Sequence, residues 1–289
     1  MDPFEKAELG GTGVMVTRLG MGLTEIGEDT TADVAWRLGV RFFDTEPDSE
    51  RRAGLLLRRR DRSRFTLSAR TGLDFSAEGV RESHEESLRR LGMDRVDVLH
   101  LRDPGDHFTE AATQALPALA AMRKDGTIRA VSAGMSQSAM LTAFARTGLL
   151  DCVLLAGRYS LLDQSGLAEL LPECRRRNIA VIAGGVYHAG VLADPFRPAT
   201  PGHHPAAPEA VARAQAMARL CDRHGVPLRA AALQFPLAHP AVTSVLVGMR
   251  SPEEAADAAA MARVRIPDGL WRDLSDAWLL DREIPVPAL

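Results

Sequence analysis

The sequence predicts an α/β fold, namely a (β/α)8 TIM barrel formed by a single domain over residues 1–289. Eight short apolar runs occur along the chain, and helix-like amphipathic stretches lie between them. Strands that alternate with helices indicate βαβ units and a parallel sheet, and eight such units close a barrel. An open dinucleotide-binding sheet fits less well, because no apolar run leads into a GxGxxG turn of the required spacing.

The predicted strands, taken in chain order, are short runs rich in apolar residues. They are TRLGMG (17–22), VRFFDT (40–45), FTLSAR (65–70), VDVLHL (96–101), IRAVSAGM (128–135), CVLLAG (152–157), IAVIAGG (179–185) and TSVLVG (243–248). Helix-like segments between them include residues 76–92, 165–178 and 208–225. These three end in Gly or Asn soon after basic residues, which is typical of helix C-termini.

Two segments lie outside this alternation. ELGGTGVMVTRLGMG (8–22) predicts an N-terminal β-hairpin with a Gly-rich turn, and we expect this hairpin to cover the bottom of the barrel. DPFRPATPGHHPAA (194–207) is rich in proline and lies between two barrel elements, so it predicts a long loop on the catalytic face.

The composition is that of an ordinary globular protein, with 46% apolar and 25% charged residues. A net charge of −3 gives no electrostatic basis for binding nucleic acid or an anionic membrane. No apolar stretch reaches 18 residues, the acidic N-terminus lacks a signal peptide, and the three cysteines lack metal-binding or CxxC spacing. We therefore expect a cytoplasmic protein with a small-molecule substrate and no metal site, and the oligomeric state stays open.

Several longer stretches resemble the aldo/keto reductase superfamily. The matching stretches are GVRFFDT, SLRRLGMDRVDVLHLRDP, RYSLLDQSGLAELLPECRRRNIAVIAGGVYHAGVLADP and HGVPLRAAALQFPLAHPAVTSVLVGMRSPEEA. Within the superfamily they are most similar to the bacterial D-threo-aldose 1-dehydrogenase and L-fucose dehydrogenase branch. The resemblance covers nearly the whole chain, and it implies the same barrel fold together with an active site at the C-terminal ends of the strands.

The resemblance also implies a catalytic tetrad of Asp, Tyr, Lys and His, of which the chain retains one residue at its expected position. Asp44 matches the aspartate, whereas DTEPD runs directly into SERRAG where the family has its tyrosine loop. Arg70 stands at the lysine position and Arg102 at the histidine position. A guanidinium stays protonated at working pH and cannot act as a general acid. We therefore predict the loss of standard reductase activity.

Three loops of the catalytic face are shorter than the resemblance implies. They are LTEIGED after the first strand, the loop after Asp44, and TGLDF after the third strand. Because the barrel body keeps the family pattern, we expect a mouth that is open on the side of these three strands.

The catalytic candidates are charged or proton-transferring side chains at the ends of the predicted strands, namely Asp44, Arg70, Arg102, Tyr187 and His188. Asp44 and Arg70 end neighbouring strands and should form an ion pair, while Arg70 and Arg102 could bind a carboxylate or enolate. Tyr187 and His188 follow the seventh strand, where they could transfer protons or simply line a pyrophosphate groove.

The resemblance gives mixed signals for a nicotinamide cofactor. Gly248, Arg250 and Ser251 are similar to the adenosine-phosphate turn of the family, and Gly190 lies where the backbone would contact the pyrophosphate. Ser136, in contrast, replaces an asparagine that binds the nicotinamide carboxamide, and Ala258 replaces an asparagine near the adenine. Binding of NADP or NAD and the absence of any cofactor are given equal weight.

Three functional hypotheses follow. The leading one is an enzyme re-tooled for non-redox chemistry, of lyase, dehydratase, isomerase or cyclase type, on a small carbonyl-bearing metabolite of secondary metabolism. The second is an NAD(P)-dependent oxidoreductase with a relocated general acid, such as Tyr187 or His188. The third is a non-catalytic ligand-binding protein.

Overall fold

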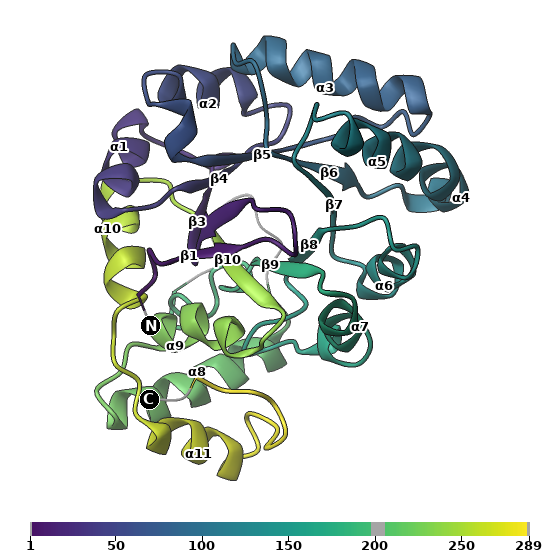
Figure 1. Ribbon diagram of the computed structural model, residues 1–289. Helices are drawn as coiled ribbons and strands as arrows, with labels where there is room; N and C mark the ends of the chain where they lie inside the picture. Colours follow the sequence, from purple (N-terminus) through teal and green to yellow (C-terminus); the bar gives the residue numbers. More distant parts are fainter. Residues whose placement is uncertain (1, 198–205, 288–289) are drawn as a thin grey trace.

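The computed structural model describes residues 2–197 and 206–287, and within them eight parallel strands close into a barrel (Figure 1). The strands are paired around the ring in the order β10-β3-β4-β5-β6-β7-β8-β9. Their bounds are β3 (Leu19–Gly22), β4 (Phe42–Asp44), β5 (Thr66–Arg70), β6 (Val98–Arg102), β7 (Ala130–Met135), β8 (Cys152–Ala156), β9 (Ala180–Gly184) and β10 (Val242–Gly248). Each coincides with a predicted run, so the predicted (β/α)8 barrel is confirmed.

Helices pack around the outside of this ring (Figure 1). They are α1 (Asp29–Leu38), α2 (Glu50–Leu57), α3 (Ala77–Leu91), α4 (Phe108–Glu110), α5 (Leu116–Lys124), α6 (Ser138–Arg146), α7 (Leu170–Arg177), α8 (Pro208–Arg223), α9 (Leu228–Gln234), α10 (Pro252–Met261) and α11 (Asp268–Asp276). A π-helical turn, Ala111–Ala115, joins α4 to α5. Gly92 and Asn178 end α3 and α7 in the left-handed conformation, which explains the C-terminal signals in the sequence.

The predicted N-terminal hairpin is present and lies across one end of the barrel. Its strands β1 (Lys6–Glu8) and β2 (Met15–Thr17) are antiparallel, and they cross the centre of the ring in Figure 1. Leu9, Val14 and Val16 are completely buried, and they pack against barrel-interior residues such as Phe42 and Val98. The hairpin therefore closes the bottom of the barrel and leaves the opposite end for a site.

The three loops predicted to be short are short in the structure. They comprise residues 23–28 between β3 and α1, 45–49 between β4 and α2, and 71–76 between β5 and α3. Most of the predicted loop 194–207 lies outside the described residues. The extent of a single domain over residues 1–289 and an open mouth beside these loops stay predictions. Among the described helices, none combines the length and the apolar composition that crossing a membrane requires.

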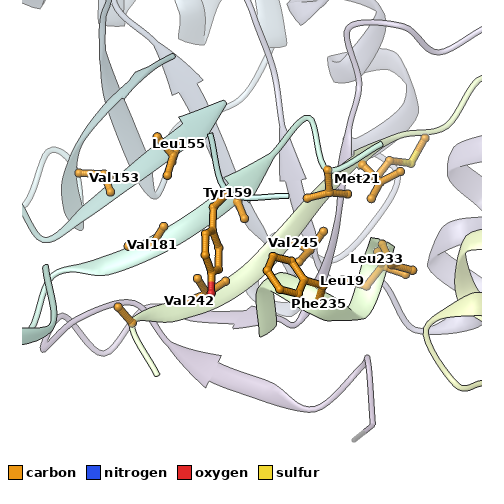
Figure 2. Packing of buried hydrophobic residues seen from close by; sticks show 14 of the residues in the cluster. Leu19, Met21, Val153, Leu155, Tyr159, Val181, Leu233, Phe235, Val242 and Val245 are labelled. Carbon is orange, nitrogen blue, oxygen red and sulfur yellow. The ribbon is translucent and has the colours of Figure 1, made fainter. Parts of the chain in front are cut away.

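One of the two tyrosines belongs to the core between the strands and the helices. Tyr159 packs against Phe235 with ring centroids 5.2 Å apart, beside Val242 (Figure 2). Its hydroxyl has no hydrogen-bond partner among the described residues. Burial raises the pKa of Tyr159, so this phenol stays protonated. Tyr159 is therefore a packing residue and not a source of protons for a site.

Replacing Gly54 by alanine is expected to destabilise the barrel by about 3 kcal/mol, the upper end of the usual cost of overpacking. Gly54 lies inside α2, where a Cβ would come within 2.9 Å of the Leu91 Cα and closer still to the Leu91 carbonyl oxygen. Urea unfolding measures this change. Leu55→Ala is the control, because Leu55 is 54% exposed and its truncation should cost less than about 0.5 kcal/mol. Equal stability of Gly54→Ala and the parent would show that the contact between α2 and α3 is not tight.

Candidate active site

A cavity of about 450 Å³ opens at the C-terminal ends of the strands, at the end of the barrel opposite the hairpin. Its walls come from the ends of β3, β4, β5, β8, β9 and β10, from the loop after β9 and from α10. Among the sequence-predicted residues, those that line it are Asp44, Arg70, Tyr187, His188, Gly190, Gly248 and Arg250. The fold therefore brings most of the candidates, which come from distant parts of the sequence, to one cavity.

Asp44 lies on the floor of the cavity and is almost completely buried, with 2% of its surface exposed. Ser68 donates a hydrogen bond to Oδ1, and Nε2 of His100 lies 3.4 Å from the same oxygen. Arg70 approaches Oδ2 at 3.5 Å. Burial acts to raise the pKa of Asp44, but His100, Arg70 and Ser68 outweigh it and the pKa is lowered. Asp44 is therefore a carboxylate at neutral pH.

Arg70 contacts two carboxylates rather than one. The predicted ion pair with Asp44 is present, and a second contact of 3.2 Å joins the guanidinium to Glu46. Glu46 comes from the shortened loop after β4 and also lines the cavity. Because two negative side chains flank the single positive one, this part of the cavity does not carry the net positive charge that an anionic substrate would require.

His100 is a residue of this site that the sequence-based list of candidates lacks. It is completely buried on β6, and its Nδ1 lies 2.7 Å from the Ser132 hydroxyl on β7. The His100 side chain therefore holds Asp44 from inside the barrel while Asp44 faces the cavity. The alternation of side chains along a strand is the signal for this position, since His100 and Arg102 are two residues apart and share one face.

Tyr187 and His188 lie in the loop after β9, and both line the cavity. The loop is tightly bent, because His188 and Ala189 adopt the left-handed conformation with φ of 49° and 53°. Burial and the nearby Asp257 raise the pKa of Tyr187, so its phenol is neutral. Tyr187 can therefore donate a hydrogen bond to a ligand in the cavity, but it is a weaker acid than a free tyrosine.

The far end of the cavity is formed by the turn between β10 and α10. Ser251 caps α10, since its hydroxyl accepts a hydrogen bond from the Glu254 backbone amide, and it does not line the cavity. The guanidinium of Arg250 is paired with the Glu254 carboxylate at 2.7 Å. The loop 23–28 is fixed to this turn, because the amides of Gly27 and Glu28 both donate to the Arg250 carbonyl.

A second ion pair, between Arg229 and Asp257, lines the same cavity as the pair of Arg250 with Glu254. Both nitrogens of the Arg229 guanidinium fork lie 2.8 Å from the two oxygens of Asp257, which joins α9 to α10. All four side chains of the two pairs line the cavity. Arg250 and Glu254 are four residues apart and pair locally, whereas the pair of Arg229 with Asp257 depends on the packing of α9 against α10 and has no signal in the sequence.

Two of the sequence-predicted residues, Arg102 and Ser136, lie on the side of the barrel away from the cavity. Arg102 ends β6 and Ser136 follows β7, whereas the cavity extends along the ends of β8, β9, β10, β3, β4 and β5. Neither residue lines the cavity. Arg102 is anchored by its backbone amide, which donates to Thr71, and the Ser136 hydroxyl contacts Gln137. Ligand contacts by Arg102 and Ser136 stay predictions.

Within residues 2–197 and 206–287, no group of three or more His, Cys, Asp or Glu is placed to hold a metal ion.

The chain matches known oxidoreductases over almost its full length. A sequence model of the aldo/keto reductase family matches residues 23–278. D-threo-aldose 1-dehydrogenase of a Pseudomonas species is 34% identical, with 95% of this chain and 97% of the relative covered. Pyridoxal 4-dehydrogenase of Microbacterium luteolum is 31% identical with 96% and 98% covered, and L-galactose dehydrogenase of Arabidopsis thaliana is 32% identical with 87% and 86% covered.

The fold comparison agrees with these matches. The structure of a glycerol dehydrogenase from Gluconobacter oxydans superposes with a TM-score of 0.77 at 20% identity, over 99% of this chain and 98% of that one. The alignment with the Pseudomonas relative extends over 322 positions, more than the 289 residues of this chain. The relative therefore carries segments that this chain lacks.

These relatives overturn the leading functional hypothesis. The three relatives that share about a third of the sequence over most of the chain are named dehydrogenases, so the expectation of non-redox chemistry is wrong. The substitutions at the tetrad positions do not amount to a demonstrated loss of catalysis, and nothing supports a degenerate site or a place in secondary metabolism. With the match over residues 23–278 and relatives above 30% identity, the chain belongs to the aldo/keto reductase family.

Proposed function

We propose that the protein is an NAD(P)-dependent dehydrogenase that oxidises a hydroxyl group of a small neutral molecule. The observation that carries this proposal is the buried carboxylate of Asp44 on the floor of the cavity. A carboxylate can accept the proton of a substrate hydroxyl, whereas reduction of a carbonyl needs a group that gives a proton. Its pKa is lowered, so Asp44 is ionised at neutral pH and is in the form that accepts a proton, which is the form that oxidation of a hydroxyl requires.

The other groups of the cavity support the same reaction. Arg70 lies beside Asp44 and can stabilise the developing charge on the substrate oxygen. Neutral Tyr187 can donate a hydrogen bond to the substrate or the cofactor. Because Arg70 is flanked by Asp44 and Glu46, the substrate class that fits best is neutral. The relatives named above act on aldoses, pyridoxal and L-galactose according to their names, which supports an oxidoreductase for small molecules.

The cavity lining fits a nicotinamide dinucleotide, which would accept a hydride from the substrate carbon when bound. Five glycines line the cavity, so phosphate groups can approach the backbone closely; they are Gly22, Gly184, Gly185, Gly190 and Gly248. Gly185 and Gly190 are left-handed, with φ of 65° and 91°, which is a conformation that favours glycine in the loop after β9. Arg250 and Arg229 also line the cavity near α10, each paired with a carboxylate. We also place the protein in the cytoplasm, since its three cysteines are free and buried.

Titration of the purified protein with NADH and with NADPH is the experiment that tests the cofactor. We expect saturable binding of at least one of them, with a Kd between about 1 µM and 1 mM, the common range of Michaelis constants. Gly248→Leu should abolish it, because the new side chain would enter the cavity from a position with an ordinary φ. Gly11→Leu, in the hairpin turn at the opposite end of the barrel, is the control. Absence of saturable binding of both nucleotides would refute the proposal and favour a protein without a cofactor.

A further inference from the structure

The end of the cavity at α10 carries charged side chains in an unusual balance. Three carboxylates line it, from Glu25, Glu254 and Asp257, against two guanidiniums, from Arg229 and Arg250. Both carboxylate oxygens of Asp257 accept hydrogen bonds from Arg229, each at 2.8 Å. In contrast to the floor of the cavity, where Asp44 belongs to the barrel interior, this end lies at a helix outside the ring of strands (Figure 1).

Arg250 and Glu254 form the closest pair at this end. Oε1 of Glu254 accepts from Nε and from a terminal nitrogen of Arg250 at 3.1 and 2.7 Å, and Oε2 accepts from the Arg250 backbone amide at 2.8 Å. Two hydrogen bonds from the loop 23–28 to the Arg250 carbonyl hold this turn in place beside the loop. Glu254 occupies the edge of the guanidinium formed by Nε and one terminal nitrogen, and its charge neutralises that of Arg250, so a second anion gains less from this arginine than from an unpaired one.

Glu25 adds a further negative charge on the opposite wall. Its carboxylate would lie 3.4 Å from a Cβ on Gly248, which places it directly beside the turn. Glu25 also raises the pKa of Arg250, after the larger contribution of Glu254, so the two carboxylates act on the same guanidinium. An anion that reached Arg250 would therefore meet both Glu254 and Glu25.

The orientation of a bound dinucleotide follows from the proposed function, on which this inference rests. Its reacting ring must reach the substrate above Asp44, so its adenosine ribose lies at the other end of the cavity, at α10. The 2′ position of that ribose carries a hydroxyl in NAD and a phosphate in NADP. A phosphate brings nearly two negative charges, whereas a hydroxyl can donate to a carboxylate.

We propose that Glu254, by occupying Arg250, makes the site select NAD over NADP. A 2′-phosphate would compete with Glu254 for Arg250 and would lie close to the negative charges of Glu254 and Glu25. The ribose hydroxyls of NAD can instead donate hydrogen bonds to the Glu254 carboxylate while it stays paired with Arg250. Glu254 is thus a specificity-determining residue, and the negative balance at α10 excludes the more highly charged cofactor.

Equilibrium titration of the parent and of Glu254→Gln with NADH and NADPH tests this assignment without any substrate. For the parent we expect NADH to bind at least about tenfold more tightly than NADPH. In Glu254→Gln, the affinity for NADPH should rise by about tenfold, because Arg250 is released, and the affinity for NADH should change by less than about threefold. Glu254 is 39% exposed, so the substitution leaves the core intact, and the melting temperature verifies this.

Glu253→Gln is the matched control. It removes the same charge one residue away, on an exposed side chain that does not line the cavity, and should leave the ratio of the two affinities unchanged. Equal or tighter binding of NADPH by the parent would overturn the inference, and so would an unchanged ratio in Glu254→Gln. If neither nucleotide binds to the parent, the proposed function fails and this inference fails with it, which is distinct from binding without selection.

Discussion

Asp44→Asn is expected to lower the turnover number for substrate oxidation by about 10²–10⁴-fold, the usual contribution of a general base. Asparagine has nearly the same shape and can still contact Ser68, but it cannot take up the proton of the substrate hydroxyl. Binding of the cofactor should persist, because the contacts of the far end of the cavity do not involve Asp44. Steady-state rates and a nucleotide titration of the same variant measure the two effects separately.

Asp48→Asn provides the matched control. Asp48 lies in the same loop after β4, is exposed, and does not line the cavity, so loss of its charge should leave the rate unchanged. A fall in rate that is shared by Asp48→Asn would indicate a general effect of charge. An Asp44→Asn protein that is folded and retains the rate of the parent would show that the base is elsewhere, and Glu46 would be the next candidate.

Arg90→Leu is expected to lower the free energy of unfolding by about 3–5 kcal/mol, because it leaves a buried carboxylate without its partner. Glu50 is the first residue of α2 and is completely buried, and its Oε2 accepts from Nε of Arg90 on α3 at 2.6 Å. The other oxygen, Oε1, has no partner among the described residues. Denaturant unfolding of the parent and the variant measures the loss.

Two further variants separate this effect from a loss of helix packing. Arg89→Leu changes the exposed neighbour on α3 and should alter stability by less than about 0.5 kcal/mol. Adding Glu50→Leu to Arg90→Leu should restore much of the stability, since the unpaired charge disappears. A single Arg90→Leu variant as stable as the parent would show that Glu50 is not held as an ion in the native protein.

The sequence predicted the barrel because its strands differ clearly from what surrounds them. Runs such as CVLLAG and IAVIAGG are buried on both faces, which makes them continuously apolar, and they match β8 and β9 closely. The ion pair between Asp44 and Arg70 was predictable for a related reason, since both residues end neighbouring parallel strands at the same edge. The hairpin at the bottom of the barrel followed from its glycines.

The rest of the site depends on packing between elements that are remote in sequence. Glu254, Arg229 and Asp257 have ordinary positions in charged helical segments, and only the placement of α9 and α10 brings them to the cavity. Arg102 ends its strand as predicted, but the side of the barrel on which a cavity forms depends on loops and helices, and no pattern in the sequence specifies that side.

The incorrect functional hypothesis has an identifiable physical origin. It treated the missing tyrosine loop after Asp44, together with the substitutions at Arg70 and Arg102, as a loss of proton transfer. In the structure, Arg70, His100 and Ser68 act together on Asp44 and maintain it as a carboxylate that faces the cavity. A base held in this way suits oxidation of a hydroxyl, whereas the hypothesis considered only the acid that reduction of a carbonyl requires.

The initial rate of nicotinamide reduction tests the central claim most directly. The parent protein and Asp44→Asn would be supplied with oxidised cofactor and a panel of neutral sugars and other small hydroxyl compounds, and the absorbance of the reduced nicotinamide would be followed. The account predicts that the parent reduces the cofactor with at least one neutral compound, at about 1–10³ s⁻¹, and that Asp44→Asn does so at least about a hundredfold more slowly. A parent that binds cofactor yet reduces it with none of these compounds, or that reduces it as fast without Asp44, would contradict the account.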